Sequence, residues 1–314
     1  MKKVYLGIDV GSISTNFVLL DENKKLCFSS YIRGGGSPIE SVKRSIQEML
    51  RQAEGDVEVL GVCATGSGRE LTGAMLGADL VKNEISAHAR AAIELHPEVR
   101  TVIEIGGQDS KVAIIRDGAV VDFAMNLVCA AGTGSFLDSQ ARRLGIEIEE
   151  LSRKAVLSKD PTMIAGRCTV FAESDMIHKQ QTGHAQEDIL MGLCQALARN
   201  FLANVCRGKE ILPPVILQGG VSANLGIRRA FEEVLGYAVI IPEHHMVMGA
   251  YGAALLAMDA KIEKTKFRGM DVGGHAVTTR GFACEDCPNN CEIMEIMDGG
   301  DVIGRTGGRC GKWQ

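Results

Sequence analysis

Two segments of the sequence place a cysteine directly before a predicted helix. In LVCAAGTGSFLDSQARRLGI, Cys129 precedes a small-residue turn and a helix that ends at Gly145. In GRCTVFAESDMIH, Cys168 precedes Thr169, a residue suited to cap a helix. The partial positive charge at a helix N-terminus lowers the pKa of a thiol and favours a bound anion. Both thiols are therefore candidate metal ligands, and the alternative is two ordinary buried cysteines at helix starts.

Two further segments repeat one order of strand, acid, glycine turn, strand and polar turn. They are VYLGIDVGSISTNFVLLDENKKL and TVIEIGGQDSKVAIIRDGAVV. Each acid is expected to end a strand, and each glycine turn lets the backbone come close to a ligand. We interpret the two segments as copies of one design, with two unrelated β-hairpins as the alternative. The alignment places Asp9 on Glu104, Gly11 on Gly106, and Asn16 on Lys111.

A third glycine turn lies in PPVILQGGVSANLGIRRAF. A buried strand over residues 215–218 leads into Gly219 and Gly220, and a helix begins near Ser222. In MGAYGAALLA, a predicted helix over 248–257, Gly249 lies on a close-packed face. Packing between helices and direct contact with a ligand both remain open for that face.

Composition and charge limit the class of protein. The 314 residues are 46% apolar and carry a formal net charge of −5, which argues against a nucleic-acid partner. No apolar stretch approaches the length of a membrane span, so no membrane partner is expected. In MKKVYLGIDV, Asp9 interrupts a very short apolar run, so no signal-peptide core is recognised and a cytoplasmic location is expected. Ten cysteines then indicate metal, redox or core roles rather than a disulfide framework.

The motifs over residues 9–12, 104–109 and 219–222 resemble the two phosphate motifs and the adenosine motif of the actin, Hsp70 and sugar-kinase ATPase superfamily. CAAGTGSFL and CTVFAESDMIH closely resemble the activator family of 2-hydroxyacyl-CoA dehydratases, which is related to the ATPase subunits of benzoyl-CoA reductase. The resemblance covers roughly residues 1–260. It implies an α/β protein with two duplicated actin/Hsp70-like (ribonuclease H-like) domains hinged around a nucleotide cleft.

We expect three parts of the chain. An N-terminal ATPase subdomain is predicted over residues 1–95, completed by the helix over 245–260. A C-terminal ATPase subdomain with the cluster cysteines is predicted over 96–260, and a Cys-rich tail over 261–314.

The resemblance assigns roles at the nucleotide site. Asp9 and Glu104 are expected to hold Mg²⁺ through its waters, and Gln108 to orient the water that attacks ATP. Glu104 stands where an aspartate is common, which implies a longer reach to the metal. Lys111 is either close to phosphate charge or a solvated strand residue. The full set of expected nucleotide contacts is Gly11, Ser12, Gly106, Gly107, Asp109, Lys111, Gly219, Gly220, Ser222 and Gly249.

Stoichiometry predicts how the two thiols are used. A [4Fe–4S] cluster needs four cysteine ligands, and Cys129 with Cys168 supplies two per chain. A two-fold homodimer with one shared cluster completes the set, and the resemblance implies the same arrangement. A nucleophilic cysteine is less favoured, because neither segment has a histidine close enough to act as its base; His178 lies too far along its helix.

The tail contains a second set of cysteines, in the pattern Cys-x2-Cys-x3-Cys followed by one more distant cysteine. Four ligands in one short segment suit zinc or a second iron–sulfur cluster, and the spacing fits neither common zinc pattern. We expect a bound metal of open identity here. Its ligands would be Cys284, Cys287, Cys291 and Cys310.

The resemblance implies an ATP-driven electron donor in an anaerobic cell. It would take an electron from ferredoxin or flavodoxin and pass it at low potential to a partner 2-hydroxyacyl-CoA dehydratase or related reductase. A small-molecule kinase of the same superfamily is the alternative, although no carboxylate base for a substrate is evident. A nucleotide-binding regulator with a zinc tail would need a DNA-binding module, and the sequence shows no helix-turn-helix pattern.

Overall fold

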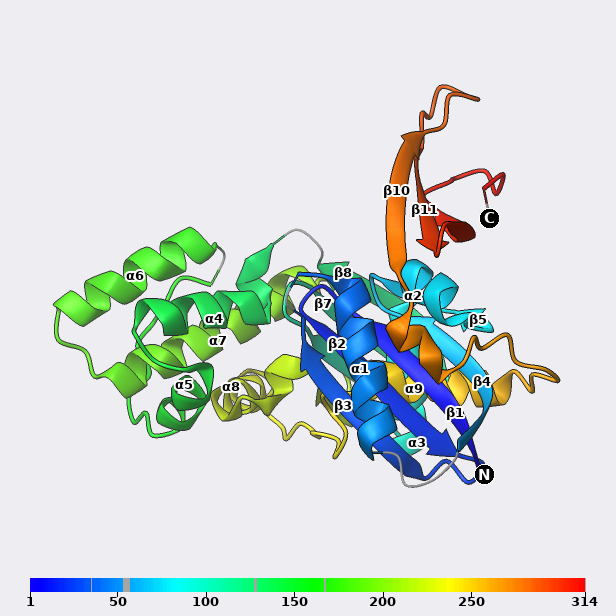
Figure 1. Cartoon of the computed structure of the whole chain (residues 1–314). Coiled ribbons are helices and arrows are strands. Elements are labelled where there is room, and N and C mark those ends of the chain that lie inside the picture. The colour runs from blue at the N-terminus through cyan, green and yellow to red at the C-terminus, as the bar shows by residue number, and fades with distance from the viewer. Residues whose placement is uncertain (35, 53–56, 127–128, 167, 314) are drawn as a thin grey trace. The chain divides into compact units, whose positions relative to one another are not determined.

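The computed structural model describes residues 1–34, 36–52, 57–126, 129–166 and 168–313. Contacts divide the chain into two compact units, which Figure 1 shows in ribbon form. The first unit comprises Met1–Ala91 and Gly249–Gln314, and the second comprises Ala92–Met248. In the described ranges, no helix combines the length and apolar character that a membrane span requires.

The first unit is built on a five-stranded sheet with the order β3-β2-β1-β4-β5. An antiparallel meander forms one side of it, and parallel strands form the other. Alternate residues of a strand face opposite sides of a sheet, and both faces of this sheet are covered. The strands are β1 Lys2–Val10, β2 Ser14–Asp21, β3 Leu26–Arg33, β4 Val57–Thr65 and β5 Leu80–Val81.

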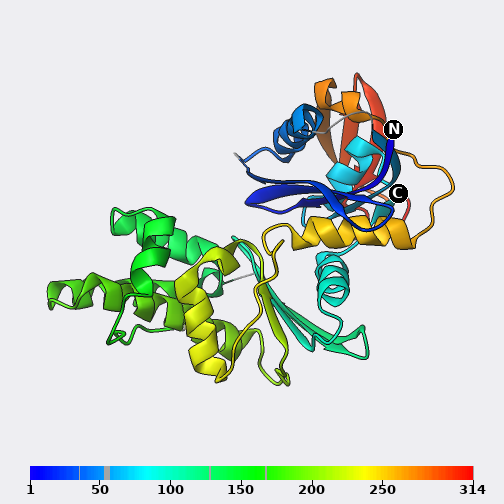
Figure 2. The ribbon, with the colours of Figure 1, turned by 90° about the horizontal axis from the view of Figure 1, so that it is seen from below.

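Helices cover the two faces of this sheet. Leu6 and Ile8 of β1 share a core with α1 (Pro38–Gln52) and α2 (Arg69–Leu76). Gly7 faces the opposite way, where a side chain would overlap the backbone of α9 (Met248–Asp259). Figure 2 shows α9 lying along the sheet on the side away from α1. A fourth helix, α3 (Glu84–Leu95), packs its backbone at Ala87 against Gly252 of α9.

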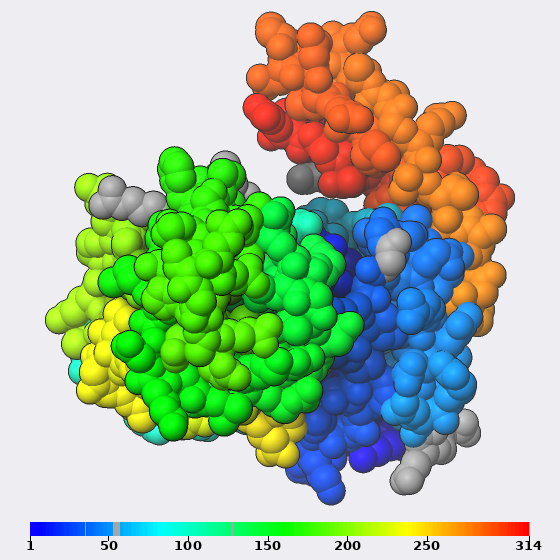
Figure 3. Space-filling view, turned by 90° about the vertical axis from the view of Figure 1, so that its left-hand side faces the viewer, coloured from blue at the N-terminus to red at the C-terminus, as the bar shows by residue number. Residues whose placement is uncertain are grey.

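The segment expected as a tail packs into the first unit (Figure 3). A short helical turn, η3 (Met270–Gly274), leads into an antiparallel sheet with the order β10-β11-β12. Val272, Val277 and Ile296 are buried in the same core as the residues of α1 and α2. These residues therefore help to complete the core of the unit. The three strands are β10 Val277–Ala283, β11 Glu292–Asp298 and β12 Asp301–Thr306.

The second unit pairs a four-stranded sheet with a helical layer. The sheet order is β8-β7-β6-β9, and α7 (Gln186–Asn204) lies at the centre of the core. Phe201 of α7 packs edge-on against Phe231, with ring centroids 5.7 Å apart. The other elements are β6 Thr101–Ile105, β7 Ser110–Arg116, β8 Ala119–Asn126, η1 Ala130–Gly132, α4 Gly134–Arg143, α5 Ile148–Ala155, α6 Thr169–Gln181, β9 Val215–Gln218, η2 Gly220–Ala223 and α8 Leu225–Leu235.

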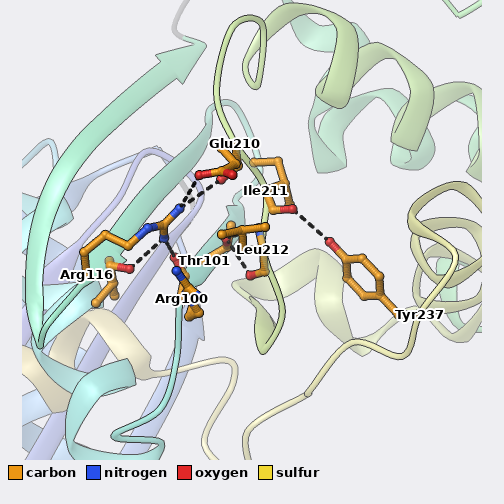
Figure 4. Close-up of polar contacts among 8 residues, drawn as sticks. Arg100, Thr101, Arg116, Glu210, Ile211, Leu212 and Tyr237 are labelled. Carbon is orange, nitrogen blue, oxygen red and sulfur yellow. Dashed lines mark hydrogen bonds and ion pairs between the residues drawn. The ribbon is translucent and has the colours of Figure 1, made fainter.

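The chain that leads into β9 is fastened to β6 and β7 by side chains (Figure 4). The Arg116 guanidinium donates to the carbonyl oxygen of Arg100 at 3.0 Å and lies 3.4 Å from Glu210 Oε2. The Thr101 hydroxyl donates to the carbonyl oxygen of Leu212 at 3.0 Å, and the Leu212 amide donates back at 3.1 Å. These bonds fix the start of β9, which ends at the third glycine turn.

The two larger sheets repeat one another residue by residue. Asp9 pairs with Asn16 across β1 and β2, and Glu104 pairs with Lys111 across β6 and β7. On the parallel side, Asp9 lies beside Thr65 and Glu104 beside Gln218. The predicted duplication and its register are therefore confirmed. Each parallel neighbour is followed by a glycine in the left-handed region, Gly66 at φ 87° and Gly219 at φ 88°.

Candidate functional site

Asp9 is the next-to-last residue of β1, and its side chain is buried. Residues paired in register point to the same face of a sheet, so Asn16 and Thr65 flank the Asp9 carboxylate. Asn16 Oδ1 and Thr65 Oγ1 are both buried and have no hydrogen-bond partner among the described residues. Buried polar atoms are nearly always paired, so these oxygens suit a bound group such as a hydrated cation.

Two glycines allow Asp9 to occupy this position. A Cβ atom on Gly66 would overlap Asp9 Oδ1, and one on Gly249 would overlap Oδ2 and lie 3.2 Å from His88 Nε2. Gly249 is therefore required for packing at the carboxylate, and its predicted contact with nucleotide stays a prediction. Sequence reasoning missed Gly66 and the buried His88; the signal for Gly66 was ATGSG directly after a strand, in the same place as QGG in the second half.

The turn between β1 and β2 contains two predicted phosphate contacts. The Gly11 amide donates to the carbonyl oxygen of Ser14 at 2.9 Å, which closes the turn. Ser12 is exposed at its tip. Such a turn can present backbone amides to an anion, so the roles of Gly11 and Ser12 remain predictions that its shape supports.

Glu104 in the second unit belongs to a buried charge cluster. Lys111 Nζ lies 2.7 Å from Glu104 Oε2 and 3.0 Å from Asp109 Oδ1, and both Lys111 and Glu104 are buried. Lys111 is therefore not a solvated strand residue. Burial raises the pKa of Glu104, whereas the Lys111 ammonium opposes that shift. Gly219 lies against the Glu104 carboxylate, because a Cβ atom there would lie 2.7 Å from Glu104 Oε1.

The second glycine turn lies directly beyond Glu104. The Gly106 amide donates to the Asp109 carbonyl oxygen at 3.0 Å, which fixes the turn. Gly107 is partly exposed, and Gln108 is exposed at the tip. An exposed amide side chain is free to reach a water molecule, so the predicted role of Gln108 stands as a prediction.

We expect the pH dependence of ATP hydrolysis to report on Glu104. Because its pKa is raised, activity that needs the ionised carboxylate is present at high pH and lost as pH falls through that pKa. Lys111→Met removes the charge that favours ionisation, so the acid limb should move to higher pH by about one unit or more. The measurement is the pH profile of Mg²⁺-dependent hydrolysis. Lys154→Met, which removes the partner of Glu150 on α5, is the control and should leave the limb in place. If the acid limb of Lys111→Met stays at the wild-type pH or moves to lower pH, the result would contradict the inference that the Lys111 charge favours ionisation of Glu104.

The third glycine turn is fixed by a serine and a histidine. Ser222 Oγ donates to the Gly219 carbonyl oxygen at 2.6 Å and lies 2.7 Å from His245 Nδ1. The Gly219 amide donates to the His245 carbonyl oxygen at 2.9 Å, and burial lowers the pKa of His245. Gly220 opens the η2 turn that follows. Sequence reasoning did not single out His245, whose only signal was a pair of histidines before α9.

Both candidate cluster cysteines occupy N-cap positions. Cys168 is the N-cap of α6, and Thr169, expected as the cap, is the first helical residue. Cys129 is the N-cap of η1, and α4 begins five residues further on at Gly134. Neither side chain makes a capping hydrogen bond; Cys129 is exposed to solvent, and Cys168 is partly exposed. The two thiols are thus available as ligands, which fits an external metal group.

Hydrogen bonds hold the backbone at Cys129 and, separately, connect the start of α4 to the glycine turn beside Glu104. Asn126 Nδ2 donates to the Cys129 carbonyl oxygen at 2.7 Å, and the Cys129 amide donates to Asn126 Oδ1 at 3.0 Å. The Gly134 amide donates to the Gly106 carbonyl oxygen at 2.9 Å, and the Ser135 amide to that of Gly107 at 2.8 Å. The first turn of α4 is therefore fixed to this glycine turn by its own backbone. This connection joins segments distant in the sequence and was not predicted.

The duplicated sheets, with an acid and a glycine turn in each half, define an ATPase of the actin and Hsp70 fold class. The model of the BadF/BadG/BcrA/BcrD ATPase family matches residues 6–257, and the chain belongs to this family. The chain is 37% identical over 253 residues to the (R)-2-hydroxyglutaryl-CoA dehydratase activating ATPase of Acidaminococcus fermentans, covering 80% of this chain and 96% of that protein.

Solved structures agree with this placement. The activator of the 2-hydroxyisocaproyl-CoA dehydratase from Clostridium difficile, with bound ADPNP, superposes with a TM-score of 0.76 at 32% identity, covering 82% of this chain and 95% of that chain. A ROK family glucokinase from Streptomyces griseus reaches a TM-score of 0.52 at 14% identity, covering 82% and 99%, and shows the shared fold alone. The predicted family and fold class are confirmed.

Proposed function

We propose that the chain is an ATP-hydrolysing iron–sulfur electron donor for a partner 2-hydroxyacyl-CoA dehydratase or a related reductase. The observation that carries the proposal is the backbone connection between the glycine turn at 106–107 and α4, the helix that follows Cys129. We infer that a nucleotide-dependent change in that turn is passed through the start of α4 and η1 to Cys129, the proposed cluster ligand. Membership of the ATPase family and similarity to named dehydratase activators support the same function.

The nucleotide chemistry follows from the carboxylates and glycine turns. Asp9 and Glu104 are the proposed ligands of the waters around Mg²⁺, and Gln108 the residue that orients the attacking water. The Lys111 ammonium favours the ionised form of Glu104, and it is the proposed source of positive charge near the phosphates. Catalysis of this type depends on positioning and electrostatics, so no strong protein nucleophile is needed.

The cluster is proposed as one [4Fe–4S] group per homodimer, held by Cys129 and Cys168 of each chain. When bound, the group supplies a one-electron carrier of low potential. The chain's own part is to hold the group at two helix starts, with Asn126 fixing the backbone at Cys129. Ferredoxin or flavodoxin is the proposed electron source, in the cytoplasm of an anaerobic cell.

A small-molecule kinase is not favoured. Its support is likeness in fold to a glucokinase at 14% identity, whereas the relatives above 30% identity include named dehydratase activators. Proteins that share this fold have many different functions, so function is argued from the residues of the site rather than from the fold. A kinase function would also leave the two N-cap thiols, Cys129 and Cys168, without a role.

The proposal is tested by electron paramagnetic resonance of the reduced protein, purified without oxygen, in the presence of MgATP and of MgADP. We expect an iron–sulfur signal that differs between the two nucleotides, because a switch needs different contacts in its two states. A colourless protein that phosphorylates a metabolite would contradict the proposal and favour the kinase.

Gly134→Ala should uncouple the two sites. A Cβ atom there would lie 3.1 Å from the Gly106 carbonyl oxygen and 2.8 Å from Val221 Cγ2, so the contact between α4 and the glycine turn must shift. We expect ATP binding and the cluster to persist while the nucleotide-dependent change of the signal is reduced at least several-fold. Gly274→Ala, where a Cβ atom meets nothing within 4 Å, is the matched control. An unchanged response in Gly134→Ala would show that coupling does not use this connection.

A further inference from the structure

The four cysteines near the C-terminus are brought to one end of the small sheet. Cys284 directly follows β10, Cys291 directly precedes β11, and Cys287 lies in the loop between them. The Cys284 amide donates to the Cys291 carbonyl oxygen at 2.8 Å, which extends the ladder of the hairpin by one pair. Paired residues of an antiparallel ladder present side chains on the same face, so these two thiols are neighbours.

The last residues fold back over the same end of the hairpin and bring Cys310 with them. The Trp313 indole N–H donates to Cys284 Sγ at 3.3 Å, and its ring packs edge-on against Phe282 at 5.1 Å. Lys312 pairs with Asp286 of the loop between Cys284 and Cys287. The residues that follow Cys310 are therefore held both against Cys284 and against the loop that contains Cys287.

The Trp313 ring beside Cys284 is flanked by two cations. The Lys312 ammonium lies 5.2 Å from the centre of the Trp313 ring, and the Arg305 guanidinium lies 5.5 Å from it. Asp286 and Glu295 are the acids that face these cations, and each is paired with them. The Trp313 indole N–H, which donates to Cys284 Sγ, is a donor of the kind that commonly surrounds metal-bound sulfurs.

We propose that Cys284, Cys287, Cys291 and Cys310 bind a [4Fe–4S] cluster within one chain, separate from the cluster shared at Cys129 and Cys168. A single zinc ion draws four sulfurs to about 2.3 Å from one point. The Cys-x2-Cys-x3-Cys spacing of the first three cysteines fits neither common zinc pattern, and among the described residues no three His, Cys, Asp or Glu side chains are already gathered around a metal position. In a four-iron cluster each cysteine binds a different iron, so the sulfurs stand further apart. The family match ends at residue 257, so this site lies outside the matched region.

The test uses the full-length Cys129→Ser/Cys168→Ser protein, which cannot form the shared cluster. After anaerobic reconstitution with iron and sulfide, we expect about four iron and four sulfide per chain and a signal on reduction. Adding Cys284→Ser and Cys287→Ser should remove both. Adding Cys27→Ser instead, a partly exposed thiol on β3, is the matched control and should change neither.

Further measurements can contradict the assignment of this cluster. In the reconstituted protein, alkylation followed by mass spectrometry should show Cys284, Cys287, Cys291 and Cys310 protected, and reactive after iron is chelated. Alkylation of these thiols while iron stays bound, about one zinc per chain in place of iron, or a disulfide between Cys284 and Cys291, would each overturn the proposal. This result does not depend on the shared cluster. If Cys129 and Cys168 bind no shared cluster, the wild-type protein and the Cys129→Ser/Cys168→Ser protein should instead contain equal amounts of iron.

Discussion

Cys129→Ser or Cys168→Ser should abolish the shared cluster and all ATP-dependent electron delivery, while nucleotide binding persists. Each substitution leaves a dimer with only two of the four thiolates that a [4Fe–4S] cluster needs, because both chains lose the same ligand. Serine keeps the size of the side chain, so the N-cap positions of η1 and α6 are preserved. The glycine turns and carboxylates of the nucleotide site lie elsewhere in the chain.

Iron analysis, the signal of the reduced protein and nucleotide affinity measure this outcome together. We expect a loss of about two iron per chain, the share of a cluster held by two chains. Cys194→Ser is unsuitable as a control, because Cys194 is fully buried in the core and burial raises its pKa to about 12. Cys27→Ser is the better control, since that thiol is partly exposed on β3. An intact shared-cluster signal in Cys129→Ser would overturn the ligand assignment.

Asp9→Asn should lower Mg²⁺-dependent ATP hydrolysis by roughly 100-fold or more and leave the cluster in place. Removing one preorganised electrostatic group at a reacting phosphate has effects of this size. Asparagine matches the volume of aspartate, which matters because Gly66 and Gly249 lie against both carboxylate oxygens. The lost activity can therefore be assigned to the charge rather than to disrupted packing.

Steady-state hydrolysis with iron content measured on the same samples tests this prediction. Asp117→Asn is the matched control, because Asp117 lies at φ 51° in the turn between β7 and β8, a conformation that asparagine tolerates. Its activity should equal that of wild type. Hydrolysis close to the wild-type rate in Asp9→Asn would mean that the phosphate site has been misplaced.

The acids and the glycine turns could be predicted from sequence because their signals are local. A buried strand, an acid and a glycine within a few residues specify an element and its end. Asp9 and Glu104 thus occupy equivalent positions in the two hairpins. Asp9 pairs with Asn16 and Glu104 pairs with Lys111, and the alignment of the two copies had matched these two partners. The helices after Cys129 and Cys168 were predictable for the same reason.

The residues that were missed act through contacts between distant parts of the chain. His88 meets Gly249 only because α3 packs on α9, and Gly134 meets Gly106 only because α4 folds back to the turn. The segment over 261–314 showed little periodicity, since short strands of a small sheet carry few buried residues each. Its contribution to the core, through Val272 and Ile296, became visible only with the fold.

The contribution of residues 261–314 to the core determines which variant should be used to test the dimer. A chain ending near Ala260 would remove core residues of the first unit, so residues 261–314 must be kept. Cys284→Ser/Cys287→Ser removes the other predicted metal site instead. Val170 and Phe171 are exposed beside Cys168, and they supply apolar area for an interface between the two chains. Two side chains fall well short of the roughly 1,200–2,000 Å² that a stable interface buries.

Anaerobic sedimentation of the Cys284→Ser/Cys287→Ser protein, before and after iron is chelated, tests the shared cluster most directly. Neither chain alone can complete a cluster with Cys129 and Cys168, so thiolate–iron bonds should hold the two chains together. We predict a dimer with iron bound and a monomer after chelation, with exposure to air giving the same result. A tight dimer in both states, or a monomer that retains a full cluster, would contradict the account.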